Sequence, residues 1–189
     1  MNILTDTLPD AVEIDGIEYK LNTDFRAALR VIMAFEDTEL TGYEKQMILI
    51  KVLYPQPPVN LQEAITQANW YLNGGKSVTA ESDGTRLYSF AKDADFIFAA
   101  FRQTHNIDLR RAELHWWEFM ALFMDLGSET TFSSLIGLRK RVKSGTASKE
   151  EKKAAQDMGE MFDVPEADTR TVDEKEAERE FMRLIKGGK

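Results

Sequence analysis

The chain has 189 residues, of which 43% are hydrophobic and 30% are charged. This length suits one domain with a sizeable core, and this composition is that of a folded protein. The formal net charge of -8 argues against a dedicated nucleic-acid-binding protein, because such proteins present a basic face to phosphates. The lack of cysteine excludes disulfides, thiolate catalysis and cysteine-ligated zinc. No apolar run approaches the about 18 residues of a membrane span, and the acidic N-terminal segment does not have the pattern of a signal peptide. We therefore expect neither a membrane nor nucleic acid as a partner.

Residues 12–21 have the pattern of a β-hairpin. Apolar side chains alternate on both sides of Asp15-Gly16, a dipeptide that favours a two-residue type I′ turn. An isolated hairpin is only marginally stable in water. We therefore expect this one to pack on the rest of the domain or to gain strands from a partner.

Three helices are predicted between the hairpin and residue 75 from the spacing of apolar side chains and from capping signals. The first begins after Asn22-Thr23-Asp24, a cluster of residues that cap helices, and ends near Glu36. The second begins at a capping box, Thr41–Glu44, and the third repeats that signature at Asn60–Glu63.

Three more helices are predicted over about 88–105, 110–126 and 131–142. The helix over 110–126 is apolar on almost all sides, so we expect it at the centre of a bundle. Its few polar residues, His115 among them, are expected on one narrow stripe.

The composition changes after residue 143. From residue 144 to 189, acidic residues outnumber basic ones, and apolar residues are reduced to two narrow stripes on either side of Pro165. The stripes are Ala154, Met158, Met161 and Phe162, and then Ala177, Phe181, Leu184 and Ile185. We predict a core of residues 1–143 and a charged, mobile pair of helices over 144–189. The expected fold class is mainly α: a compact bundle of about six helices with an N-terminal β-hairpin and a charged C-terminal helical pair.

No motif in the sequence predicts an enzyme, a cofactor site or a metal site. Gly75-Lys76-Ser77 lacks the earlier glycine that a P-loop requires. His105 and His115 are the only histidines and lack metal-ligand spacing, so His105 is expected near a helix C-terminus. Asp93 and Asp95 are two residues apart, which places them on different faces of a helix. They are expected to cap a helix or to lie in solvent.

Two further clusters have two interpretations each. Arg139–Lys143 is basic, and we interpret it as positive charge that complements a helix C-terminus and not as a nucleic-acid site. His115-Trp116-Trp117 places two indoles about 100° apart on a helix, which favours a core position between two packing partners. The alternative is a groove for an apolar helix, where tryptophan is often a hot spot and methionine makes a tolerant surface. On that alternative, the partner-binding candidates are Trp116, Trp117, Met158, Met161, Phe162, Phe181, Leu184 and Ile185.

Nine short segments within the first 143 residues are informative as a set, because of both their sequences and their order along the chain. The set comprises Met1-Asn-Ile-Leu4, Leu8-Pro9, Val12-Glu-Ile-Asp-Gly16, Asn22-Thr-Asp-Phe-Arg26, Asp95-Phe-Ile-Phe-Ala-Ala-Phe101, Ile107-Asp-Leu109, His115-Trp-Trp-x-Phe119, Thr131-Phe132 and Leu138-Arg139. In this order the segments resemble the bacteriophage gene-product-fifteen family.

The resemblance implies a tail assembly chaperone of phages with long, non-contractile tails, mostly of Gram-positive hosts and their prophages. Such a protein is not an enzyme: it binds the tape measure protein, keeps it soluble and helps to recruit tail tube subunits. It acts in the host cytoplasm and is absent from the mature virion. Self-association is also expected, because the hairpin offers strand edges. The resemblance assigns no binding residues.

Three alternatives to a chaperone remain. A tail completion or connector protein would stay in the mature particle. A DNA-mimicking inhibitor would have denser rows of acidic residues than this chain has. An enzyme would need a convergent polar pocket, which the sequence does not indicate.

Overall fold

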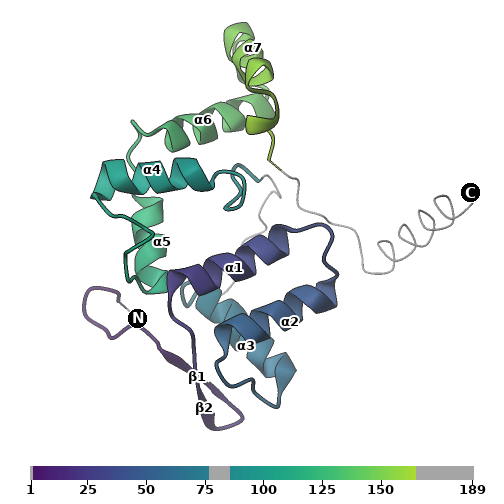
Figure 1. Ribbon diagram of the computed structural model, residues 1–189, viewed down its shortest axis with the longest axis vertical. Coiled ribbons are helices and arrows are strands. Elements are labelled where there is room, and N and C mark those ends of the chain that lie inside the picture. Colours follow the sequence, from purple (N-terminus) through teal and green to yellow (C-terminus); the bar gives the residue numbers. More distant parts are fainter. Residues whose placement is uncertain (1, 77–85, 165–189) are drawn as a thin grey trace, which may run out of the picture.

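Seven α-helices follow an N-terminal hairpin in the computed structural model, which describes residues 2–76 and 86–164 (Figure 1). The elements are β1 (Ala11–Ile14), β2 (Ile17–Lys20), α1 (Phe25–Glu36), α2 (Gly42–Leu53), α3 (Leu61–Leu72), α4 (Ala94–His105), α5 (Trp116–Met124), α6 (Thr131–Lys143), α7 (Lys149–Met158) and the short 3-10 helix η1 (Gly159–Met161). The predicted mainly α class and the hairpin are confirmed. Of the predicted C-terminal pair, α7 is described, and the second stripe lies outside the described residues.

The hairpin has the predicted turn. Val12 pairs with Tyr19 and Ile14 with Ile17, and Asp15 and Gly16 between the strands have φ values of 52° and 76°. Positive φ at both central residues is the requirement of a type I′ turn. Strand β1 packs on α3, which buries the side chains of Val12 and Ile14.

The first three helices begin where their capping signals predict. Asp24 accepts a hydrogen bond from the N–H of Arg26, and Thr41 forms a complete capping box with Glu44. At the start of α3, Asn60 accepts from the N–H of Glu63. Helix α2 contacts both α1 and α3, and these three helices form one half of the domain, next to the hairpin in Figure 1. Helix α1 also contacts α5.

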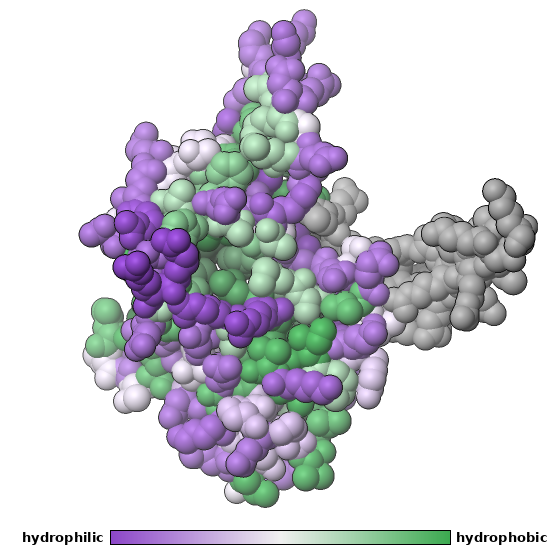
Figure 2. Space-filling model, in the orientation of Figure 1, coloured by the Kyte–Doolittle hydropathy of each residue, from purple (hydrophilic) through white to green (hydrophobic). Residues whose placement is uncertain are grey.

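Helix α5 lies at the centre, as its apolar sequence predicts. Phe119 is fully buried and stacks on Phe25 of α1 at 4.8 Å and on Phe101 of α4 at 5.0 Å between ring centroids. The other half of the domain consists of α4, α6 and α7, with α6 packed on both α4 and α7. In Figure 2 the end formed by α7 is covered mainly by hydrophilic residues.

Two predicted helix starts are wrong. Helix α5 begins at Trp116 and not near 110, because His115 caps it: His115 Nδ1 accepts from the N–H of Trp117, and Glu118 accepts from the N–H of His115. His115 is therefore a capping residue and not part of a polar stripe within the helix. Helix α4 begins at Ala94 and not at 88, because residues 87–93 form a turn around a buried carboxylate.

His105 lies at the C-terminal end of α4, as predicted, where its Nε2 is 2.9 Å from the carbonyl oxygen of Leu122. None of the helices in the described ranges combines the length and the apolar character that crossing a membrane requires.

Candidate partner-binding groove

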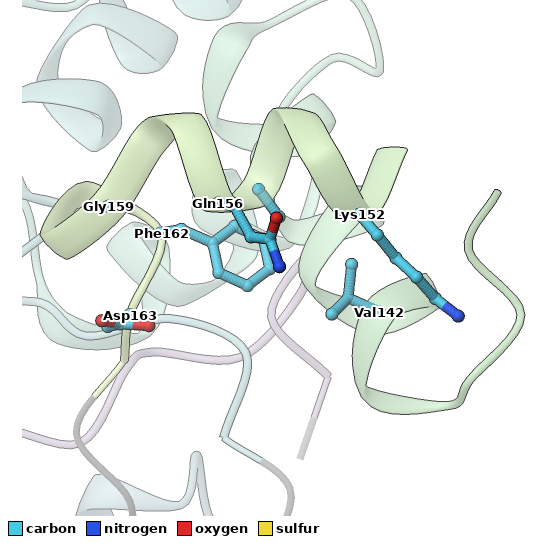
Figure 3. Close-up of a pocket in the computed structure, with 7 residues that line it drawn as sticks. Val142, Lys152, Gln156, Gly159, Phe162 and Asp163 are labelled. Carbon is cyan, nitrogen blue, oxygen red and sulfur yellow. The ribbon is translucent and has the colours of Figure 1, made fainter. Parts of the chain in front are cut away.

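A groove of about 440 Å³ separates α6 from the segment formed by α7 and η1 (Figure 3). On the α6 side the lining residue is Val142, and the other lining residues belong to α7, η1 and the segment after them: Lys152, Ala155, Gln156, Gly159, Phe162 and Asp163. In Figure 3 the ring of Phe162 lies beside Gln156, and Val142 and Lys152 lie farther along the hollow. The mixture of apolar lining and charged ends is typical of a surface that binds an amphipathic segment.

A tight turn joins α6 to α7. Gly145 has a φ of 75°, and the N–H of Ala147 donates to the carbonyl of Arg141. Ser148 then starts α7 with a capping box that includes Glu151. The N–H of Ser148 lowers the pKa of the Glu151 carboxyl, and Arg141, whose Nε lies 2.8 Å from Glu151 Oε1, lowers it further. An ion pair thus joins the two helices across the turn.

Gly159 lines the groove at the point where α7 ends. Helix α7 stops there because Gly159 has φ 54° and ψ -132°, a conformation that residues with a Cβ rarely adopt. The chain then turns back toward α6 through η1. This reversal brings the carbonyl oxygens of Met161 and Phe162 within 2.8 Å of the Arg139 guanidinium.

Arg139 on α6 fixes this end of the groove through a fully satisfied buried guanidinium. Its Nε donates to Phe162 O, its Nη1 to Leu87 O and Asp93 Oδ2, and its Nη2 to Asp93 Oδ1 and Met161 O. These bonds use all five N–H donors of the side chain. The exposed fractions of the Arg139 and Asp93 side chains are 0% and 2%. A buried charge pair is tolerated when its hydrogen-bonding capacity is met in this way.

The predicted roles of Asp93 and Arg139 are therefore wrong. Asp93 makes no side-chain cap on α4 and does not lie in solvent, because it pairs with Arg139 and accepts from the N–H of Ser89. Arg139 is not part of a solvated basic end, although Lys140 and Lys143 do lie in the last turn of α6 as predicted. Arg139 lies on the same buried face of α6 as Phe132 and Leu135. A charged residue on an apolar helix face was the one sequence signal that could have indicated a buried ion pair.

Lys92 and Glu36 extend this polar network to both sides. Lys92 Nζ donates to the carbonyls of Glu160 and Asp163, each at 3.1 Å, which attaches the segment after α7 to the turn before α4. On the other side, Glu36 at the end of α1 accepts from the hydroxyl of Ser89 at 2.6 Å. A connected series of side chains thus links α1, the 87–93 turn, α6 and the groove.

Of the predicted partner-binding residues that the structure describes, only Phe162, which is half-buried, lines this groove. Met158 and the exposed Met161 lie on either side of Gly159 in the chain and are not in the lining. Trp116 and Trp117 lie elsewhere, between α3 and α5, and Phe181, Leu184 and Ile185 lie outside the described residues. In the predicted stripe Met158 and Phe162 are half-buried, whereas Met161 is exposed and Ala155, not Ala154, is the buried alanine of α7.

The two tryptophans have the core arrangement. Their exposed fractions are 3% and 6%, and their indole N–H groups donate to the carbonyls of Leu72 and Tyr71 at 3.0 and 2.8 Å. Satisfied indole donors are what burial of tryptophan requires. Trp117 also packs against Gly75, where a Cβ would lie 2.7 Å from the ring.

No group of three or more His, Asp or Glu side chains within residues 2–76 and 86–164 is arranged to hold a metal ion. The groove offers a surface for packing and hydrogen bonding, with one basic and one acidic side chain, Lys152 and Asp163, in its lining.

The family model described as Bacteriophage Gp15 protein matches residues 4–164. The chain belongs to the bacteriophage Gp15 family. The Gp15 match indicates a phage structural or assembly protein. It extends beyond residue 143 and thus past the ordered short segments, and it includes α7, η1 and every described residue that lines the groove. Searches of curated proteins and of solved structures gave no match for this Gp15 protein.

Proposed function

We propose that this Gp15 protein is a non-enzymatic tail assembly chaperone that binds the tape measure protein of a phage with a long, non-contractile tail. Membership of the Gp15 family supports a role in phage structure or assembly. The observation that carries the finer proposal is the groove between α6 and α7, because its lining suits an amphipathic helix.

A tape measure protein is long and helical, and its apolar faces remain exposed until the tail tube encloses them. One such helix would place an apolar side chain against Val142 and Phe162, with its polar face toward Lys152 and Asp163. Many copies along one client would add avidity without a strong contact in any single groove. The net charge of -8 would keep the covered filament soluble by mutual repulsion.

We test this proposal by co-expressing the chain with its tape measure protein and measuring how much of the client is soluble and co-purifies. The groove variant is Val142→Asp, which places a charge on the half-buried groove wall. Its matched control is Met124→Asp, which makes the same kind of change at an exposed position on α5 that does not line the groove. We expect loss of client solubility with Val142→Asp only. Loss with Met124→Asp and not with Val142→Asp would assign client binding to α5.

The remaining parts of the proposal follow if the protein is a chaperone that acts only during tail assembly. The protein would act in the host cytoplasm, bring tail tube subunits to the client and leave before the virion is complete. The second candidate, a tail completion or connector protein, is consistent with the same family match. Mass spectrometry of purified phage separates the two, because only the structural protein would be found in mature particles.

A further inference from the structure

The outer edge of β2 presents backbone hydrogen-bonding groups that point away from the domain. Ile17 and Tyr19 pair with β1, and residues next to them in an antiparallel ladder direct their N–H and C=O groups outward. Those residues are Glu18 and Lys20. Within residues 2–76 and 86–164, the backbone groups of Glu18 and Lys20 make no hydrogen bond on this outer side. Strand β2 is also largely exposed, whereas β1 is packed on α3.

The side chains on this edge carry charges of opposite sign, two residues apart. Glu18 lies directly opposite Glu13 of β1, so the hairpin itself places two carboxylates side by side. Lys20 forms an exposed ion pair with Asp10 at 2.8 Å. A partner strand that brought a cation next to Glu18 would relieve the repulsion between the two carboxylates.

We propose that this edge binds a second copy of the chain, through antiparallel pairing of two β2 strands about a two-fold axis at Tyr19. In that register Glu18 of each copy faces Lys20 of the other, and the outward N–H and C=O groups of both residues are satisfied. Two hairpins then form one four-stranded sheet. The contact is closed and symmetric, so it yields a dimer and not a fibre.

Charge selects this register over its neighbours. Because only Glu18 and Lys20 direct backbone groups outward, antiparallel registers differ in steps of two residues. One step in either direction places Glu18 opposite Glu18, or Lys20 opposite Lys20, and like charges directly opposite are destabilising. The ladder cannot extend past Lys20, because the N–H of Asn22 is used in a 2.7 Å hydrogen bond to Leu53 O.

Ile17 adds an apolar contribution to the same interface. Its side chain is 57% exposed and lies on the face of the hairpin that carries Tyr19. In the proposed register Ile17 lies diagonal to the half-buried Tyr19 of the second copy and opposite its Leu21, which is only 6% exposed and so contributes little. The interface remains short, so we expect a weak dimer with a dissociation constant of roughly 10 µM to 1 mM.

Sedimentation equilibrium of the full chain without client, up to about 1 mM, measures this dimer directly. Glu18→Lys and Lys20→Glu each create like-charge pairs across the two-fold axis, and each should weaken the dimer by about tenfold or more. The double reversal Glu18→Lys/Lys20→Glu restores opposite charges and should return the dissociation constant to within about threefold of the original. The loss of the Asp10 contact is common to Lys20→Glu and the double variant, so that loss cannot explain a rescue.

The control for net charge is Lys51→Glu, an exposed change on α2 that should leave the dimer intact. A chain that stays monomeric at about 1 mM would overturn the proposal, and would leave the edge for a strand of another protein. Single reversals that act no more strongly than Lys51→Glu, or a double reversal that gives no rescue, would also overturn it. These outcomes are independent of client binding, because no tape measure protein is present.

Discussion

Arg139 and Asp93 form a bidentate ion pair across the interior of the protein, with Nη–Oδ distances of 2.7 and 3.0 Å. The remaining donors of Arg139 bind three backbone carbonyls, two of which belong to the segment that closes the groove. The pair therefore connects the turn before α4 with the segment after α7. Stability and the shape of the groove depend on the same guanidinium.

Removing one member of this pair should be severely destabilising. Asp93→Ala leaves a buried guanidinium without its counter-charge, and breaking a buried pair in this way costs about 3–5 kcal/mol. Chemical denaturation with urea measures the loss in the free energy of unfolding. Arg139→Lys should also be destabilising, because an ammonium has three donors where the guanidinium uses five. A loss below about 1 kcal/mol for Asp93→Ala would show that the pair is not buried as described.

Gly159→Ala tests the reversal of the chain after α7. No atom of the described residues lies within 4 Å of the added Cβ, so the expected effect comes from the backbone conformation at φ 54° and ψ -132°, which favours glycine. We expect a loss of about 1–3 kcal/mol in the free energy of unfolding. The matched control is Gly137→Ala in the interior of α6, where the added Cβ lies 3.2 Å from the flexible end of the exposed Arg141 side chain, which can move aside. Alanine should therefore be neutral or stabilising by up to about 1 kcal/mol there. Equal effects at the two positions would contradict the assigned turn.

Trp117→Phe separates a core role of the indole from a binding role. The substitution removes the 2.8 Å hydrogen bond to Tyr71 O, which keeps its 3.1 Å hydrogen bond from the N–H of Gly74, and the smaller ring no longer fills the space beside Gly75. From the lost hydrogen bond and the lost packing together we expect a loss of about 1–3 kcal/mol in the free energy of unfolding, measured by thermal or urea denaturation. Client co-purification at low temperature should be unchanged. A folded Trp117→Phe variant that no longer binds the client would place the binding surface at α3 and α5.

The raised pKa of the buried Tyr54 hydroxyl predicts how the stability of the protein changes at alkaline pH. Burial, together with the nearby charge of Glu63, raises the pKa of Tyr54 from its usual 10 to about 12, and its hydroxyl donates to Ala64 O at 2.8 Å. The pKa of Tyr54 is higher in the folded state than in the unfolded state. The stabilisation of the folded state by the neutral Tyr54 hydroxyl is therefore complete below pH 10 and is lost as the pH rises through 12. Tyr54→Phe should lower stability by about 1 kcal/mol at neutral pH and reduce the loss between pH 10 and 12. An unchanged alkaline profile would contradict the burial of this hydroxyl.

Local signals predicted the elements whose structure depends on nearby residues. Asp15-Gly16 predicted the turn of the hairpin, and Thr41 with Glu44 predicted the start of α2, because turn and cap geometry depend on side chains within a few positions. His115 was missed as a cap because histidine is not among the usual capping residues.

Long-range contacts decided what the sequence could not predict. Asp93 and Arg139 are 46 positions apart, and no local pattern pairs them. Phe90 and Ala94 have helical spacing, yet the chain between them turns so that Asp93 can reach Arg139. The groove is equally non-local, because its far wall depends on the return of the chain at Gly159. Phe162 was predicted from its apolar stripe, whereas Lys152 and Gln156 were not.

Co-expression with the tape measure protein is the most direct test of the proposed function. The soluble, co-purifying fraction of the client is compared for the natural chain, Val142→Asp and Met124→Asp, with each variant shown to be folded by circular dichroism. We predict that the natural chain and Met124→Asp keep the client soluble and bound, and that Val142→Asp does not. A client that remains insoluble and unbound in the presence of the natural chain would contradict the assignment of this Gp15 protein as a tape measure chaperone.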